Sequence, residues 1–441
     1  MKFKRVLALS AATVMALGSF TGCASSNQGG SATPEPSKDT TQTATSTEKE
    51  TEKPKDVTLK VWGPQEDQVA TANAPKGILP AMCENFAAQH PEWNITFEYG
   101  VCGEDIAKDE VTKDVNAAAD VYFLANDQIP ILVEAGAIAK LGGTTVDTIK
   151  GTNDGSMVTS VSYQDSIYAV PFTPNTWFMY YDKSKFTEDE VKSLDVMMSK
   201  DLGEGVSNFA FPLTNGWYIA SFYYGAGGTL FGDGTDPAGG CTFNSPEGVE
   251  VTKYLVNLAK NPKFSNEQDG SSIAKFKEGK LGAYCSGSWD AAAIKEALGD
   301  NFAATKIPTF KVAGVDGQMK SFAGSKAIGV NPTSKNPEVA VALALYLGSE
   351  EAQVFRFEER GIIPTNTNAA QNEAVKADVV ASAQMLEIKE ASVAQPVLKE
   401  MGSYWSPAEV LGKEIVQGDV TEDNAADKLA KFVDAVVNPS N

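Results

Sequence analysis

Three tryptophans of the sequence lie at the ends of expected elements, where they could contact a ligand. Trp217 follows an Asn-Gly turn, Trp289 follows Gly-Ser at the junction of an expected strand and helix, and Trp405 precedes a Ser-Pro helix start. Side chains at the ends of elements are more exposed than those inside apolar runs. A pyranose ring has an apolar face that stacks on aromatic rings, and tryptophan offers the largest platform. Core packing is the alternative, and we favour it for Trp62, which lies inside an alternating strand.

Two short polar segments follow expected strands and could supply hydrogen bonds to the same ligand. Residues 65–67 (QED) come after the alternating run 57–62 (VTLKVW), and residues 126–128 (NDQ) come after the apolar run 120–124 (DVYFL). Ligands of open α/β sheets bind beyond the carboxyl ends of the strands. We therefore expect both segments to face a binding site.

Most common catalytic machinery is missing from the sequence. There is one histidine, His90, and there is no GxSxG elbow, no P-loop and no GxGxxG turn that opens a helix. The cysteine spacings match no zinc pattern. We therefore expect no catalytic residue, no cofactor and no metal site. A glycosidase needs only two carboxylates, so that class of enzyme stays open as an alternative.

The composition limits the partners of the protein. The formal net charge is −20 at pH 7. This charge opposes binding to nucleic acid and to anionic lipid surfaces. It suits an exported protein with an uncharged ligand, although solubility alone would explain it equally well.

The first 56 residues are predicted to be a targeting signal followed by a flexible tether. A basic start precedes an apolar run, residues 6–20, that is too short to span a bilayer comfortably, and small residues then lead to Cys23. Residues 1–23 resemble a bacterial lipoprotein signal, in which the cysteine becomes the lipidated first residue; an ordinary cleaved signal is the alternative. Residues 24–56 are rich in Ser, Thr, Pro, Glu and Lys and are expected to be disordered. The lipid on Cys23 is the only membrane anchor that we expect, because no other apolar run approaches transmembrane length.

Four further cysteines leave two interpretations open. An exported protein can form disulfides, and four cysteines allow three pairings. Pairing of nearest neighbours would join Cys83 to Cys102 and Cys241 to Cys285. Buried free thiols are the alternative.

From residue 57 onward, strand patterns alternate with helix patterns, which predicts an α/β fold with a mostly parallel sheet. This part is long enough for two lobes with separate cores. Residues 169–182 (AVPFTPNTWFMYYD) contain two strand-like runs separated by Pro174 and Asn175. They indicate either a chain that leaves one sheet and enters another, or one buried strand with a kink.

Several stretches of this part carry a likeness to a known family. They are, in chain order, VTLKVWGPQED, ADVYFLANDQ, IYAVPFTPNTWFMYYDKS, SIAKFKEGKLGAYCSGSWD, KSFAGSKAIGVNP, NPEVAVALALYLGSEEAQVFRF and GSYW. In their order and spacing they resemble the maltose and maltodextrin-binding family, the sugar-binding components of ABC importers. The likeness covers nearly all of residues 57–441.

The resemblance implies a two-lobe periplasmic-binding-protein fold with hinge strands between the lobes. The expected N-lobe is formed by residues 57–172 with 328–375, and the C-lobe by residues 173–327 with 376–441. Crossings between the lobes are expected near residues 173–178, 322–327 and 372–378. Gly324 would be the flexible point of the second crossing.

The resemblance also implies a set of ligand-binding residues. They are Trp217, Trp289, Trp405, Asp127, Glu66, Asp67, Gln128, Asn175, Asn215 and Glu104, and for Glu104 a solvated surface charge is the alternative. The sequence departs from the family where Asp67 replaces a lysine, Leu124 a stacking tryptophan, Gln128 an arginine, and Asn175 and Asn215 glutamates. The tryptophans of the family's second lobe are thus retained while the polar residues are changed. We therefore expect an oligosaccharide site, and whether maltose is its ligand stays open.

These features predict a lipoprotein that captures malto-oligosaccharides and delivers them, by lobe closure, to the membrane subunits of an ABC importer. We expect a monomer at the extracellular face of the cell membrane, attached through its lipid only, with no affinity for nucleic acid. The alternatives are a binder of another neutral oligosaccharide, a secreted glycosidase, and a chemoreceptor ligand or surface adhesin on the same fold.

Overall fold

The computed structural model describes residues 53–268 and 270–439. The expected signal peptide, residues 1–23, its Cys23 and most of the expected tether lie outside these residues. Strand β1 begins at Lys55, because residues 55 and 56 pair in parallel with Trp93 and Asn94 of β2. The expected start of the folded part at Val57 is therefore wrong by two residues.

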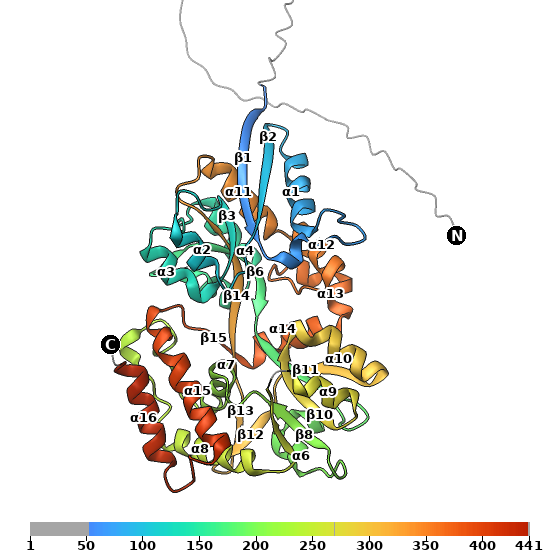
Figure 1. The fold of residues 1–441 in the computed structure, drawn as a ribbon, viewed down its shortest axis with the longest axis vertical. Coiled ribbons are helices and arrows are strands. Elements are labelled where there is room, and N and C mark those ends of the chain that lie inside the picture. The colour runs from blue at the N-terminus through green and yellow to red at the C-terminus, as the bar shows by residue number, and fades with distance from the viewer. Residues whose placement is uncertain (1–52, 269, 440–441) are drawn as a thin grey trace, which may run out of the picture. The chain divides into compact units, whose positions relative to one another are not determined.

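The first sheet has six strands, and two of them, β1 and β3, are followed by the polar segments 65–67 and 126–128 (Figure 1). Its order is β15 (Ser392–Ala394), β14 (Ser321–Val330), β3 (Val121–Ala125), β1 (Lys55–Gly63) and β2 (Trp93–Val101), and β6 (Ala169–Asn175) also pairs with β14. Strands β1, β2 and β3 are parallel, whereas β14 runs antiparallel to β3 and β6. The loops after β1, β2 and β3 consequently meet at one edge of the sheet.

Helices cover this sheet and share one apolar core with it. They are α1 (Ile78–Gln89), α2 (Ala107–Lys113), α3 (Ile129–Glu134), α4 (Thr144–Thr152), α11 (Pro337–Leu347) and α12 (Glu350–Arg360). Helix α5 (Gly155–Ser160) contacts β6 and β14, and α13 (Glu373–Ala377) contacts α12. The short strands β4 (Ser162–Tyr163) and β5 (Ser166–Ile167) form a hairpin after α5. Helix α1 buries Ile78, Leu79, Met82, Cys83 and Phe86, as its spacing predicts.

A second sheet has five strands and is buried on both faces. Its order is β11 (Phe302–Thr305), β7 (Trp177–Asp182), β10 (Leu281–Gly287), β8 (Ser207–Phe211) and β9 (Phe264–Asn266). Along β7, Trp177 and Met179 enter one core, while Phe178 and Tyr180 enter another. This alternation explains why the strand is aromatic or apolar from Trp177 to Tyr181: both of its faces are covered.

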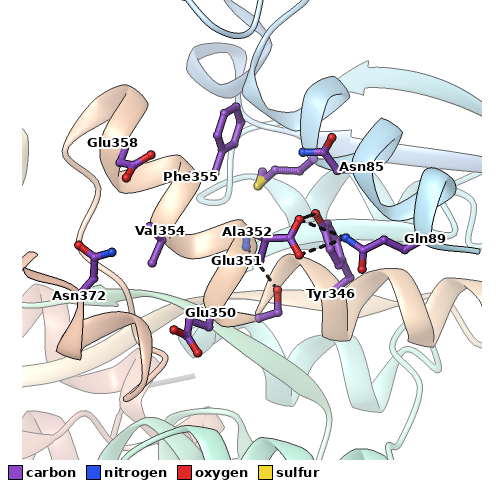
Figure 2. Close-up of a pocket in the computed structure, with 12 residues that line it drawn as sticks. Asn85, Gln89, Tyr346, Glu350, Glu351, Ala352, Val354, Phe355, Glu358 and Asn372 are labelled. Carbon is purple, nitrogen blue, oxygen red and sulfur yellow. Dashed lines mark hydrogen bonds between the residues drawn. The ribbon is translucent and has the colours of Figure 1, made fainter. Parts of the chain in front are cut away.

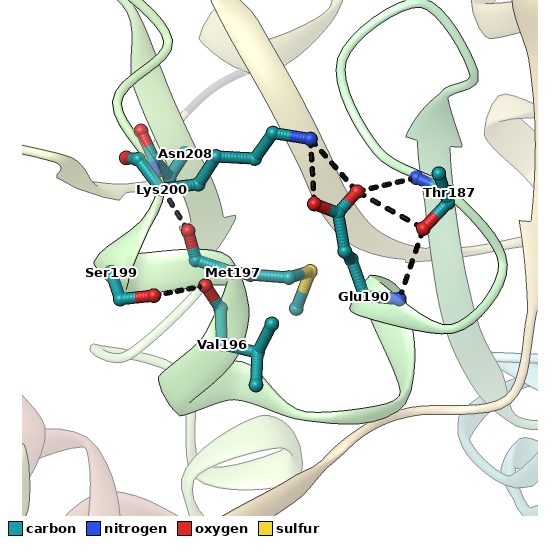
Figure 3. Close-up of polar contacts among 7 residues, drawn as sticks. All are labelled: Thr187, Glu190, Val196, Met197, Ser199, Lys200 and Asn208. Atoms are coloured by element: carbon teal, nitrogen blue, oxygen red, sulfur yellow. Dashed lines mark hydrogen bonds and ion pairs between the residues drawn. The ribbon is translucent and has the colours of Figure 1, made fainter.

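The helices of the second sheet are α6 (Leu194–Ser199), α7 (Gly216–Gly225), α8 (Pro246–Lys260), α9 (Ser271–Lys277), α10 (Ala291–Leu298), α14 (Val379–Glu390), α15 (Gly402–Gln417) and α16 (Ala425–Val437). A small hairpin of β12 (Thr309–Val312) and β13 (Val315–Gln318) lies against α7 and α8. Ser245 caps α8 and Ser349 caps α12: each side chain accepts from a backbone N–H of the first turn. Figure 3 shows how α6 is attached to β8: the Asn208 amide donates to the carbonyls of Met197 and Lys200, at 2.7 Å each, and Glu190 holds the Lys200 ammonium.

Residues 169–182 connect the two sheets. Strand β6 belongs to the first sheet and β7 to the second, with only Thr176 between them. The prediction of a chain that changes sheets is confirmed, and the kinked single strand is wrong. The Thr176 and Ser321 hydroxyls are 2.9 Å apart, so this crossing lies beside the start of β14. The α/β class is confirmed, and the exact limits of the lobes stay predictions.

The four cysteines that the structure describes are free and buried. The expected nearest-neighbour disulfides are therefore wrong, and the alternative of buried thiols is confirmed. Burial raises the pKa of Cys83 and of Cys241 to about 12, and that of Cys102 to about 11. Thiols with such pKa values stay protonated at neutral pH and behave as small apolar side chains.

Candidate functional site

Two of the predicted tryptophans form one aromatic surface. The ring centroids of Trp217 and Trp289 are 6.0 Å apart, with their planes inclined by 32°. Trp217 lies in the first turn of α7, and Trp289 lies in the short 3-10 helix η5 (Ser288–Asp290) that joins β10 to α10. Trp289 is 54% exposed, which is unusual for so large an apolar side chain. We call this pair, together with Trp405, the aromatic floor.

Trp405 reaches the floor through the packing of α15 on α7. A Cβ atom at Gly216 would lie 3.1 Å from the carbonyl oxygen of Trp405, so a larger residue would push the two helices slightly apart. Helix α15 begins at Gly402, not at Ser406 as predicted, because the 3-10 helix η8 (Lys399–Met401) leads directly into it. Trp405 is therefore inside the first turn, and Pro407 lies within the helix.

The support of Trp289 is a set of local contacts. A Cβ atom at Gly287 would lie 2.0 Å from the indole of Trp289, so the ring folds back over the glycine. The Gly287 carbonyl accepts from the Tyr180 hydroxyl at 2.9 Å, and the Ser286 hydroxyl donates to the Asp290 carboxylate at 2.6 Å. These bonds fix the backbone on both sides of the tryptophan.

Gln395 fixes Trp217, and sequence reasoning missed it. The indole N–H of Trp217 donates to Gln395 Oε1 at 3.0 Å, and the Gln395 backbone N–H donates to the Ala323 carbonyl of β14 at 2.9 Å. The floor is thereby connected to the strand that leads back into the first sheet. These partners lie 178 residues apart in the chain, so no local pattern could have indicated the contact.

A recess of about 600 Å³ lies beside the first turn of α7, the turn that carries Trp217. Its lining includes Asn215 and Tyr218 on either side of Trp217, and also Tyr284, Glu267 and Glu409. Asn215 caps α7, because its side chain accepts from the Trp217 backbone at 2.9 Å. Glu267 is buried, and its Oε1 has no hydrogen-bond partner among the described residues. Hydroxyls, an amide and carboxylates next to aromatic rings are the groups that a sugar requires.

Three of the predicted polar residues, which follow or end strands of the first sheet, are at least partly exposed to solvent. Glu66 and Asp127 are exposed, and Asn175, at the end of β6, is half-buried. Desolvation raises the pKa of Asp127 although the residue is exposed, as expected for a carboxylate in a concave surface. These side chains are free to meet a ligand.

Two predicted polar residues are wrong as ligand contacts because their polar atoms are already used. Asp67 is fully buried and its carboxylate is paired with both Arg356 and Arg360 of α12. Gln128 is buried, donates to the carbonyls of Glu104 and Asp105 at 2.7 Å, and accepts from the Lys108 backbone at 2.8 Å. Both residues hold the loops that carry the exposed candidates.

Two further predictions are corrected in part. Glu104 is 5% exposed, so the alternative of a solvated surface charge is wrong. Gly324 is not explained by flexibility: a Cβ atom there would lie 2.6 Å from Asn126 Oδ1, which accepts from the Ser325 backbone at 3.1 Å. The glycine is needed for this close approach between β14 and the loop after β3.

A larger recess, of about 640 Å³, lies between α1, α11 and α12 (Figure 2). Its side chains are paired with one another: the Gln89 amide lies 3.1 Å from both oxygens of Glu351, and the Tyr346 hydroxyl donates to the same carboxylate at 3.1 Å. Neither recess has a floor tryptophan in its lining, but the smaller one is lined by Asn215 and Tyr218, close to Trp217 in the chain, whereas the larger one lies among helices of the first sheet. We therefore assign the candidate site to the floor and not to the larger recess.

Within the part of the chain that the structure describes, no three potential metal ligands gather into a site. In the same residues, no helix combines the length and the apolar character needed to cross a membrane.

Comparisons with known proteins agree on one family. A family model described as bacterial extracellular solute-binding protein matches residues 81–383. The galactooligosaccharide-binding protein of Bacillus subtilis is 28% identical over 326 residues, which cover 71% of this chain and 75% of the relative. One solved structure, with acarbose, is 46% identical with a TM-score of 0.77, covering 86% of this chain and 98% of that chain. The maltodextrin-binding protein MalE1 from L. casei BL23, solved without ligand, is 28% identical with a TM-score of 0.78, covering 87% and 99%.

Proposed function

Because the chain belongs to the bacterial extracellular solute-binding proteins, we propose that it captures a neutral oligosaccharide on its aromatic floor and delivers it to an ABC importer. The observation that carries this proposal is the pair formed by Trp217 and the half-exposed Trp289. Two large rings at this spacing suit the apolar faces of consecutive sugar units.

The polar contacts would come from the opposite sheet. Asp127, Glu66 and Asn175 are exposed or half-buried candidates for hydrogen bonds to sugar hydroxyls. Asn215 contributes its remaining amide group, because its Oδ1 already caps α7. Binding on both sides would favour a closed form of the two lobes, with rotation at Thr176 and β14, and the importer's membrane subunits would recognise that form.

Malto-oligosaccharides are the first ligands to test. The relatives divide on this point: the Bacillus subtilis protein is named for galacto-oligosaccharides, whereas the L. casei protein is named for maltodextrins. Calorimetry of the chain from residue 24 onward against maltotriose, maltotetraose, and galacto-, xylo- and manno-oligosaccharides would decide the class. Tight binding of one series supports the proposal, and no binding of any series contradicts it.

We propose a carrier and not an enzyme. A glycosidase would require two carboxylates at a fixed separation across the scissile bond. Glu267 and Glu409 line the same recess and are the pair to examine. Release of reducing sugar from maltotetraose during a long incubation would identify an enzyme, and binding without turnover a carrier.

The protein would act as a monomer at the extracellular face of the membrane. Lipidation of Cys23 would hold it there, and residues between Cys23 and β1 would serve as the tether. Labelling of the exported chain with a fatty-acid analogue tests this anchor, and Cys23→Ser should abolish the label.

A further inference from the structure

Lys326 is a charged residue in an otherwise buried stretch of β14. It lies opposite Ala125 of β3 and Thr173 of β6, where the register of β14 against β6 shifts between residues 326 and 327. The side chain is 36% exposed, while its strand neighbours Ser325 and Ala327 are buried. Its position is therefore level with the end of β3, where Asn126 and Asp127 follow.

The ammonium of Lys326 lies over a buried carboxylate. Lys326 Nζ is 3.4 Å from Glu104 Oε1, and the Glu104 side chain is 7% exposed. Among the described residues, this oxygen has no hydrogen-bond partner, and neither has Asn126 Nδ2. The Glu104 backbone is fixed, because its carbonyl accepts from Ala125 N at 3.0 Å and from Gln128 Nε2 at 2.7 Å.

This arrangement differs from an ordinary surface ion pair. In the pair of Lys76 and Glu84, at 2.8 Å, both side chains are exposed, by 73% and 56%. Such pairs contribute little and are freely solvated. In the pair of Lys326 and Glu104 the carboxylate is removed from solvent, so its attraction for the ammonium 3.4 Å away is screened less by water.

Building on the proposed function, we infer that Lys326 contacts the bound oligosaccharide and that Glu104 positions its ammonium. An ammonium has three donors and no acceptor, so the donors that Glu104 does not use can reach sugar hydroxyl oxygens. Lys326 lies on β14, which pairs with β6, the strand that ends at Asn175, and with β3, the strand that Asn126 and Asp127 follow. We call Asp127, Asn175 and Lys326, which come from neighbouring strands of the first sheet or directly follow them, the polar wall. Because Lys326 lies within the expected second crossing, residues 322–327, this contact would couple ligand binding to the hinge.

The test is calorimetry with maltotriose on the chain from residue 24 onward. Lys326→Met removes the donors at nearly constant length and should weaken binding about tenfold or more, the effect of losing a hydrogen bond to a charged group. Lys76→Met, the matched control in the same lobe, should bind within about twofold of wild type. Glu104→Gln should weaken binding in wild type and have no further effect in the Lys326→Met background, because it acts through the lysine.

A second measurement separates contact from mere structure. Maltoside analogues that each lack one hydroxyl should bind the wild-type protein more weakly than the parent maltoside does. For at least one analogue, the Lys326→Met variant should bind analogue and parent equally. Equal losses for every analogue in both proteins, or unchanged affinity of Lys326→Met, would overturn the role of Lys326 while leaving the proposed function intact. If Lys326→Met does not fold, Lys326→Gln serves in its place. Wild-type protein that binds no oligosaccharide would overturn both.

Discussion

Trp289 shows at the scale of one residue how an exposed aromatic ring can serve binding more than folding. Its indole rests on Gly287 and more than half of it faces solvent. Aromatic anchors typically cost about 2 kcal/mol or more when truncated, which is roughly thirtyfold in affinity. Trp289→Ala should therefore weaken maltotriose binding by about this factor in calorimetry, with little change in melting temperature. Trp289→Tyr, which keeps a smaller platform, should lie between. A variant that unfolds, while the folded fraction binds normally, would show that Trp289 is a core residue.

Gln395 should act on binding only through Trp217. Gln395→Leu removes the acceptor of the Trp217 indole and leaves its N–H without a partner, whereas Gln395→Glu keeps an acceptor at the same place. We expect Gln395→Leu to weaken maltotriose binding about five- to tenfold, the effect of one lost hydrogen bond, and Gln395→Glu to weaken it less. In a Trp217→Ala background the two Gln395 variants should bind alike. If they still differ there, Gln395 has a role of its own.

At this scale the sequence predicts residues whose surroundings are local. Trp289 is placed by the glycine and serine next to it, and Asn215 by the helix that it precedes. Asp67 could not be interpreted correctly, because the arginines that neutralise it lie 289 and 293 residues further along the chain. The same limit hid Gln395 and Lys326, whose partners come from other elements.

Helix α14 contains a buried acid, Glu387, next to Ser321 at the start of β14. Glu387 is fully buried, accepts from the Ser321 hydroxyl at 2.6 Å and from the Ile307 backbone at 2.8 Å, and burial raises its pKa from 4.5 to about 8. The folded protein therefore binds this proton more tightly than the unfolded chain does. The contribution to stability is fully present below about pH 4.5 and is lost as the pH rises through about 8.

Glu387→Gln should remove this pH dependence. The free energy of unfolding of the variant, relative to wild type, should rise between pH 5 and pH 9 by an amount on the order of a few kcal/mol. Denaturant unfolding at both pH values measures it, and other titrating groups cancel in the difference. Glu338→Gln, which changes an exposed carboxylate on α11, is the control and should show no such trend. A difference that is constant with pH would mean that Glu387 titrates normally.

Elements were predictable where one pattern decides them. A serine cap marks the starts of α8 and α12, and a proline at the first helical position marks the starts of α8 and α11, because these signals act within one turn. The predicted start of α15 was wrong. Ser406 and Pro407 have the pattern of a helix start, but they lie inside a helix that begins at Gly402 and packs on Gly216. Gly324 was attributed to flexibility for a similar reason: its true neighbour, Asn126, follows a strand almost 200 residues earlier.

At the scale of the whole molecule, the chain changes sheets within a single residue, Thr176, and β14 pairs with three strands of the first sheet. The sequence indicated a change of sheet as one of two interpretations, but it did not show that the two prolines would lie inside β6, paired with β14 across a shift in register. It did not predict that Ser321 and Glu387 would join the crossings through buried hydrogen bonds, because such networks depend on three distant segments.

Two sheets connected in this way, with the aromatic floor on one and the polar wall on the other, lead to our last prediction: ligand should make the molecule more compact. A ligand shifts a conformational equilibrium only by its additional contacts in the favoured state, and a sugar that bridges floor and wall has such contacts only when the lobes close. Small-angle scattering at saturating maltotriose should therefore give a smaller radius of gyration than scattering without sugar. A sugar that calorimetry shows not to bind should leave the radius unchanged at the same concentration. If saturated wild-type protein keeps the radius of the empty protein, the sugar binds to one lobe only, and delivery to an importer must depend on something other than closure.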